Sequence, residues 1–120
     1  MSPTIPKIRT KVWLEVNDMH IFGSGLAGLL DNIDQLGTLT AAAHQSNMSY
    51  RHAWNLIRHA ENHLGRQLVH RRPGGSGGGH SALSPDARHL LSSFNKISSD
   101  ITGYANERFA SLFSQEKGTE

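Results

Sequence analysis

Two different spacings of apolar residues divide the first part of the chain. Over residues 7–16 apolar and polar side chains alternate for most of the run, which is typical of a half-buried strand. Asn17-Asp18 supplies turn chemistry, so residues 7–22 predict a β-hairpin whose return strand is 19–22. From Leu26 to Ile33 the spacing becomes helical, and Gly37 is expected to end this helix.

Two short helices are predicted next, in tandem. The first runs through the alanines at 41–43 and is capped by Thr38 or Thr40; the second runs from its cap, Ser49, to Leu64. Residues 46–47 form the turn between them. The second helix has one apolar face (53, 57, 60 and 64), and the alanines of the first let the two axes cross closely. This is the pattern of a helix-turn-helix.

A hairpin with a long tip follows. Residues 68–72 and 81–83 can extend as strands, whereas residues 73–79 include five glycines, whose entropic cost excludes regular structure. Beside a helix-turn-helix, such a hairpin is a wing.

The last predicted helix opens with Ser84 as its cap and Pro85 at its first position. Its apolar stripe continues at nearly heptad spacing to residue 113. A long helix with one apolar face needs a partner helix, so we predict a homodimer. The residues expected at the dimer interface are Leu90, Leu91, Phe94, Ile97, Ile101, Tyr104 and Phe109.

These elements predict a mainly α protein with a small β component: a winged helix-turn-helix with an N-terminal β-hairpin and a long C-terminal dimerisation helix. At 120 residues the chain suits one domain. Its expected segments are an arm and hairpin (1–23), a winged helix-turn-helix core (24–83, with the wing at 68–83), a dimerisation helix (84–113) and a frayed tail (114–120).

Composition narrows the possible functions. The absence of cysteine excludes disulfides, thiol catalysis and cysteine-based zinc sites. No apolar stretch has the length of a signal peptide core or a transmembrane span, so a cytoplasmic protein without a membrane partner is expected. No paired carboxylates or Ser/His/Asp grouping can be recognised, and we predict neither an enzyme nor a cofactor.

Positive charge is concentrated in one third of the chain, although the net charge is only +2. Residues 44–80 contain six of the eight histidines and a single acid, Glu61. The same stretch holds five arginines: Arg51, Arg58, Arg66, Arg71 and Arg72. Such clustering is expected of a surface that binds phosphates.

The second helix of the tandem pair carries the candidate recognition residues, which are Ser49, Tyr50, Arg51, Trp54, Asn55 and Arg58. Arginine is the usual partner of guanine and asparagine of adenine, while hydroxyls at a helix start suit phosphate. The alternative is a solvated polar face. An outward Trp54 and the preceding alanine-rich helix favour DNA.

The wing supplies a second candidate set, namely Arg71, Arg72, Gly74, Gly75, Ser76, Gly77 and His80. Arginines can hold phosphate or enter the minor groove, and glycines let backbone N–H groups approach the duplex. Alternatively, the tip is only a loop with a solubilising base. A nucleotide-binding P-loop is not predicted, because its lysine and Ser/Thr are missing.

His59 and His63 lie four residues apart, with His52 seven before His59, and this spacing can bind a transition metal. Apart from Glu61 between them, no Cys, Asp or Glu ligand lies nearby in the sequence. Histidines close to phosphate are the simpler interpretation, so no metal site is predicted.

Three stretches resemble the amino-terminal domain of ModE, the molybdate-dependent transcriptional regulator family: residues 33–43, 48–54 and 68–79. The most specific features are Ser49-Tyr50-Arg51-His52-Ala53-Trp54 and the glycine-rich wing. The helix-turn-helix is more distantly similar to that of LysR-type regulators. The resemblance covers about residues 20–95 and implies a homodimer, joined by its terminal helices, on a palindromic DNA site.

The regulator that gives the family its name also has a carboxy-terminal molybdate-binding region. This sequence reaches Glu120 without a counterpart, so we expect that molybdate sensing does not carry over directly. The alternatives are regulation without an effector, a separate effector-sensing protein, or a domain excised from a longer chain, of which excision is the less expected.

Three hypotheses therefore remain. The first is a sequence-specific transcriptional regulator of genes for oxyanion or metal-cofactor metabolism. The second is an accessory or architectural DNA-binding protein without base specificity, and the third a small oxyanion- or metal-binding protein.

Overall fold

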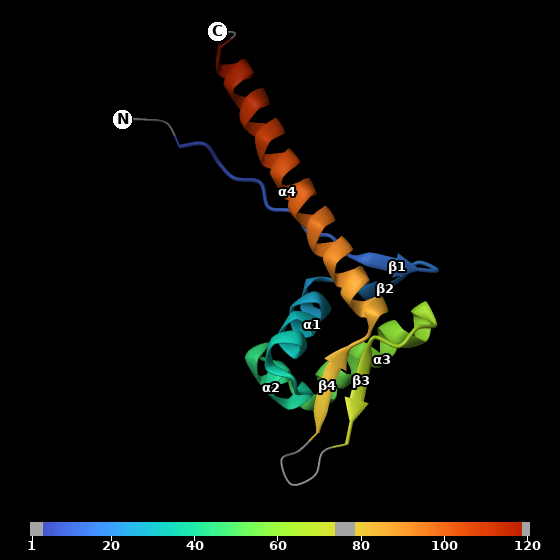
Figure 1. The fold of residues 1–120 in the computed structure, drawn as a ribbon. Coiled ribbons are helices and arrows are strands. Elements are labelled where there is room, and N and C mark those ends of the chain that lie inside the picture. The colour runs from blue at the N-terminus through green and yellow to red at the C-terminus, as the bar shows by residue number, and fades with distance from the viewer. Residues whose placement is uncertain (1–3, 74–78, 119–120) are drawn as a thin grey trace.

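The structure is a computed structural model that describes residues 4–73 and 79–118, and it confirms the predicted winged helix-turn-helix (Figure 1). The elements follow in the order β1 (Leu14–Val16), β2 (Met19–Phe22), α1 (Ser24–Leu36), α2 (Leu39–Gln45), α3 (Tyr50–Leu64), β3 (Val69–Arg72), β4 (His80–Leu83) and α4 (Pro85–Gly118). Each pair of strands is antiparallel, β1 with β2 and β3 with β4.

The N-terminal hairpin is shorter than predicted. Asn17 and Asp18 both have positive φ, the geometry of a two-residue turn between strands. However, β1 begins only at Leu14, so the strand expected over residues 7–16 is wrong for residues 7–13. That segment lies along α4 instead (Figure 1), where Ile8 exchanges two hydrogen bonds of 2.9 Å between its backbone N–H and C=O and the side-chain amide of Asn106.

Capping residues set where these helices begin and end. Thr38 Oγ1 accepts a hydrogen bond from the Ala41 N–H and so caps α2. Ser49 Oγ caps α3 in the same way. Gly37 and Gly65 end α1 and α3 with φ values of 80° and 67°, a left-handed conformation that suits glycine.

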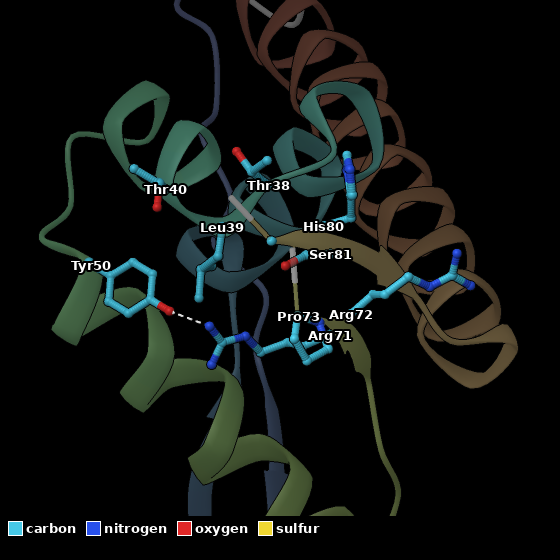
Figure 2. A pocket seen from close by; sticks show the side chains of 10 residues that line it. Thr38, Leu39, Thr40, Tyr50, Arg71, Arg72, Pro73, His80 and Ser81 are labelled. Atoms are coloured by element: carbon cyan, nitrogen blue, oxygen red, sulfur yellow. Dashed lines mark hydrogen bonds between the residues drawn. The ribbon is translucent and has the colours of Figure 1, made fainter. Parts of the chain in front are cut away.

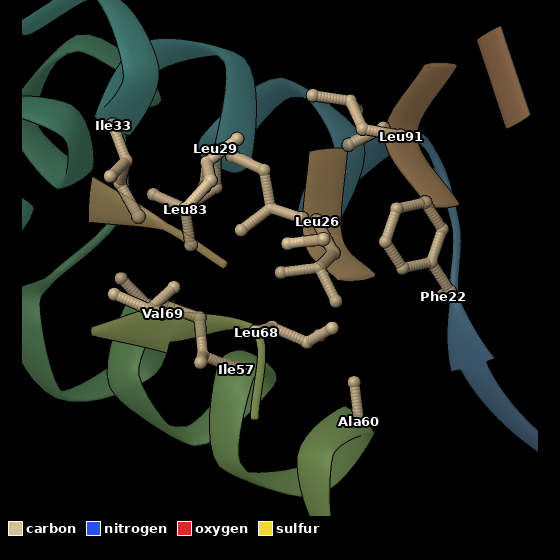
Figure 3. Packing of buried hydrophobic residues seen from close by; sticks show 14 of the residues in the cluster. Phe22, Leu26, Leu29, Ile33, Ile57, Ala60, Leu68, Val69, Leu83 and Leu91 are labelled. Atoms are coloured by element: carbon tan, nitrogen blue, oxygen red, sulfur yellow. The ribbon is translucent and has the colours of Figure 1, made fainter. Parts of the chain in front are cut away.

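A single core joins the helices to both hairpins (Figure 3). Phe22 from β2 meets the ring of Phe94 from α4 edge-on, with centroids 5.0 Å apart. The residues labelled around them come from α1, α3, β3, β4, α4 and the position before β3: Leu26, Leu29, Ile33, Ile57, Ala60, Leu68, Val69, Leu83 and Leu91. Because α3 and β3 share this core, α3 and the β3–β4 hairpin have a common support.

The long helix α4 has two parts. Leu91 and Phe94 are buried in the core of their own chain, so their predicted place in a dimer interface is corrected. Further along, Ile97, Ile101 and Tyr104 are exposed. Leu90 and Phe109 are half-buried.

The same helix continues to Gly118, so its predicted end at residue 113 is too early. Within the described residues, no helix combines the length and the apolar character needed to cross a membrane.

Candidate nucleic-acid interface

Helix α3 presents three different faces to its surroundings. Ala53, Ile57 and Ala60 are completely buried and fix the helix on the core. Arg51 and Asn55 stand on the opposite side, and both are exposed. A helix with one buried and one polar exposed face can enter the major groove while it stays attached to its domain. The third face is a flank that meets β3.

Tyr50 and Arg71 connect this flank to the wing. Arg71 Nη2 donates a hydrogen bond of 2.8 Å to the Tyr50 hydroxyl (Figure 2). The guanidinium carbon of Arg71 also lies 4.9 Å from the centre of the Trp54 ring, a cation–π distance. The start of the recognition helix and the base of the wing therefore lie side by side.

Trp54 differs from its predicted position. Instead of pointing outward, it is half-buried and packs against the core. Its ring supports a second guanidinium, that of Arg58, at 5.4 Å from the ring centre. A helical projection placed Trp54 near the exposed face, but Arg71, whose guanidinium lies over its ring, comes from β3, in a different part of the chain. The indole is thus a platform for two arginines.

Glu61 supports the site from within the fold, and sequence reasoning did not identify it. Its Oε2 atom accepts hydrogen bonds from the backbone N–H groups of Leu68, at 2.8 Å, and Val69, at 3.2 Å. These bonds tie the last turns of α3 to the beginning of β3. The available signal was its position as the only acid within the basic segment.

A pocket of about 410 Å³ opens between the start of α2, the start of α3 and the base of the wing (Figure 2). It is lined by Thr38, Leu39, Thr40, Tyr50, Arg71, Arg72, Pro73, Gly79, His80 and Ser81. Hydroxyls beside two arginines suit a phosphate group. The three hydroxyl residues Thr38, Thr40 and Ser81 were not among the predicted site residues, although Thr38 and Thr40 were considered as caps.

The two wing arginines point in different directions. Figure 2 shows Arg71 directed toward Tyr50 and Arg72 directed away from it, as expected for neighbours in a strand. Arg72 and His80 are both exposed. The predicted wing residues Gly74, Gly75, Ser76 and Gly77 lie outside the described residues.

Carboxylates do not neutralise this surface in the part of the chain that the structure describes. The two ion pairs there join Arg66 to Asp86, at 3.6 Å, and Arg88 to Asp34, at 2.9 Å. Neither pair includes Arg51, Arg58, Arg71 or Arg72. Four positive charges on α3 and β3 thus remain available to an anionic partner.

The rings of His59 and His63 are in contact, with centres 4.4 Å apart and planes tilted by 50°. His63 Nδ1 is 2.9 Å from the His59 carbonyl oxygen, and His59 Nε2 is 3.2 Å from that of His20, so both rings can donate to backbone. Among the described residues, no group of three or more potential ligands could hold a metal ion.

The fold and this basic surface define a winged helix-turn-helix module. The chain belongs to the lysR family of bacterial regulatory helix-turn-helix proteins, whose family model matches residues 27–88. It is also similar to several curated proteins. Molybdenum transport protein ModE of Herbaspirillum seropedicae is 34% identical over 83 residues, or 69% of this chain and 31% of the relative.

The second relative, molybdenum-pterin-binding protein MopB of Rhodobacter capsulatus, is 30% identical over 66% of this chain and 29% of its own length. The third is transcriptional regulator ModE of Haemophilus influenzae, 34% identical over 58% of this chain and 27% of the relative. In each case the chain spans less than a third of the relative's length. Membership of a family of regulatory proteins indicates a role other than catalysis.

Proposed function

We propose that this protein is a sequence-specific DNA-binding transcriptional regulator. The observation that carries the proposal is the 2.8 Å bond between Arg71 and Tyr50, which places the wing beside a recognition helix whose Arg51 and Asn55 are exposed. This contact supports a single DNA-binding surface made of donors from the helix and from the wing.

In this mechanism α3 enters the major groove, where only hydrogen-bonding groups and methyl groups distinguish the base pairs. Arg51 would donate two hydrogen bonds to guanine, and Asn55 would both donate to adenine and accept from it. Ser49, at the start of the helix, and the arginines of the wing would bind the sugar–phosphate backbone and set the register.

We infer that two chains act together on a palindromic site. The exposed apolar residues of α4, among them Ile97, Ile101 and Leu112, support pairing with the same helix of a second copy. A twofold protein reads inverted half-sites, whose centres lie about one helical turn of DNA apart. Binding to chromosomal DNA places the protein in the cytoplasm.

The effector remains a separate part of the proposal. Two of the similar proteins have molybdenum in their names, which supports a link between this regulator and genes of molybdenum or oxyanion metabolism. The chain matches less than a third of each relative. As one route to any response to the oxyanion, we propose a separate effector-sensing protein.

Fluorescence anisotropy with a duplex from the region upstream of its own gene, followed by footprinting, tests the proposal. We expect submicromolar affinity at low salt, a steep loss as salt rises, and a protected palindrome. Diffuse protection would instead support an architectural protein. A flat salt dependence would contradict DNA binding altogether.

A further inference from the structure

Two guanidinium groups share one indole ring, and they come from different elements. Arg58 belongs to α3 and Arg71 to β3, yet their guanidinium carbons lie 5.4 Å and 4.9 Å from the centre of the Trp54 ring. Like charges repel, and the ion pairs found within residues 4–73 and 79–118 lie elsewhere. The Trp54 ring lies beside both cations and the Tyr50 hydroxyl binds Arg71, and a bound anion would offset the repulsion between the two guanidinium groups.

We propose that Arg58 and Arg71 form one clamp for phosphodiester groups, with Trp54 as its platform, so that the recognition helix and the wing grip the same stretch of DNA backbone. The inference rests on the proposed function, and it reassigns Arg58 from base reading to phosphate binding. Trp54 and Tyr50 are positioning residues in this clamp.

The chemistry of the guanidinium group supports this ligand. A guanidinium is planar, and its N–H groups lie along its edges, so stacking on an indole leaves donors free for the two oxygens of a phosphodiester. Tyr50 occupies one N–H of Arg71, and the remaining donors stay available. The hydroxyls of Thr38, Thr40 and Ser81 line the pocket that Arg71 also borders.

The position of the cluster also argues for backbone rather than bases. Arg71 reaches the Trp54 ring from β3, at the flank of α3. The Arg58 backbone lies on the same exposed face as Arg51 and Asn55, but its guanidinium carbon lies 5.4 Å from the centre of the half-buried Trp54 ring. A guanidinium held at the flank of a groove-binding helix is closer to the sugar–phosphate wall than to the base edges.

Arginine variants separate the two interpretations. We expect R58A and R71A to lose the same factor in affinity for the specific duplex and for a scrambled one, and each to lower the slope of log K against log salt by about 1. R66A is the matched control: it removes an exposed arginine that is paired with Asp86 and lies outside the cluster. We expect its slope to match that of the wild type.

A loss by R58A that is confined to the specific duplex would show that Arg58 reads a base, and it would overturn the clamp while the proposed function stands. Failure of the wild type to bind either duplex would overturn the proposed function instead.

Trp54 itself supplies a second readout. W13F leaves Trp54 as the only tryptophan, since the chain has two. We expect its fluorescence to change on addition of duplex, and this change to disappear in a W13F/R58A/R71A background. No change at saturating duplex, or a saturable response to inorganic phosphate or molybdate at constant ionic strength with none to duplex, would overturn the clamp.

The conservative variant completes the test. We expect W54F to keep most of the affinity, because a ring remains, and W54L to bind with the reduced salt slope of the arginine variants. An unchanged salt slope in a folded W54L would contradict the platform. Since Trp54 packs against the core, thermal unfolding checks that W54L is folded. If it is not, the test depends on R58A and R71A, which change exposed side chains.

Discussion

The Glu61 Oε2 atom lies 2.8 Å from the backbone nitrogen of Leu68, and this bond fixes where the wing begins. A carboxylate near the end of a helix is opposed by the helix dipole, so its bonds to strand N–H groups offset an unfavourable position. As a result, β3 is attached to both ends of α3: by Glu61 at one end and by the bond between Arg71 and Tyr50 at the other.

We expect Glu61→Ala to lower the free energy of unfolding by about 1–3 kcal/mol, because it leaves two backbone N–H groups of the wing without their acceptor. Urea denaturation measures the change. Glu107→Ala, at an exposed position on α4, is the control and should stay within about 0.5 kcal/mol of the wild type. Equal values for the two variants would contradict a role for Glu61 in holding the wing.

Arg51→Ala should weaken binding to the specific duplex by about 1–3 kcal/mol and relax the base preference at one position, because a guanine contact carries sequence information. Binding measurements on a set of single-base variants of the site check this. His52→Ala, the next exposed residue of α3, should leave the preference unchanged. A uniform loss on every sequence would instead assign Arg51 to phosphate.

Tyr50→Phe removes the hydroxyl that holds Arg71 and keeps the ring. Because the bond is exposed, we expect the free energy of unfolding to change by no more than about 1 kcal/mol. DNA affinity should fall more clearly, since Arg71 loses its orientation. In an Arg71→Ala background the same change should have no further effect on affinity, and an additive loss would show that Tyr50 acts independently of Arg71.

Ile101→Asp should convert the proposed dimer to a monomer without unfolding the domain, because the side chain is exposed on the distal part of α4. Analytical ultracentrifugation gives the mass. Ser99→Asp, exposed on the same helix, adds the same charge and should leave the dimer intact. A wild-type monomer at micromolar concentration would refute the proposed pairing of α4 helices.

Phe94→Ala, in contrast, should lower the free energy of unfolding of each chain by about 3–5 kcal/mol, because it opens a cavity in the core.

Asn106→Ala should release the N-terminal arm from α4, since it removes both hydrogen bonds to the Ile8 backbone. Limited trypsin digestion should then cut after Lys7 and Arg9 faster than in the wild type, while the domain remains folded. Asn95→Ala, at an exposed position on the same helix, should not change the rate. Unchanged cleavage in the Asn106 variant would show that other contacts hold the arm.

Elements with local signals were predictable from the sequence. The caps at Ser49 and Ser84 and the helix ends at Gly37 and Gly65 depend on a few adjacent residues, and the structure places them as expected. The strand predicted from residue 7, by contrast, begins only at Leu14. The Ile8 backbone before it binds the side chain of Asn106, which lies 98 residues away, and no local pattern could indicate this.

The candidate site shows the same division. Periodicity separated the buried face of α3 from the face of Arg51 and Asn55, because that separation depends on one helix alone. The roles of Trp54 and Glu61 depend on a strand that approaches the helix flank, so a helical projection assigned Trp54 to the outside and gave Glu61 no partner. Likewise, the stripe on α4 could not show that Leu91 and Phe94 pack within their own chain.

The length of α4 has a mechanical consequence for a pair of chains. The helix has 34 residues, which corresponds to about 51 Å, and only its first turns rest on the core. If two chains join at the far ends of α4, each DNA-binding domain lies at the opposite end of a long helix from the joint. A tilt of about 5° at the joint moves a DNA-binding domain by about 4 Å, comparable with the rise of one base pair, about 3.4 Å. A slight change in the crossing angle of the two helices would therefore displace the two domains from their half-sites.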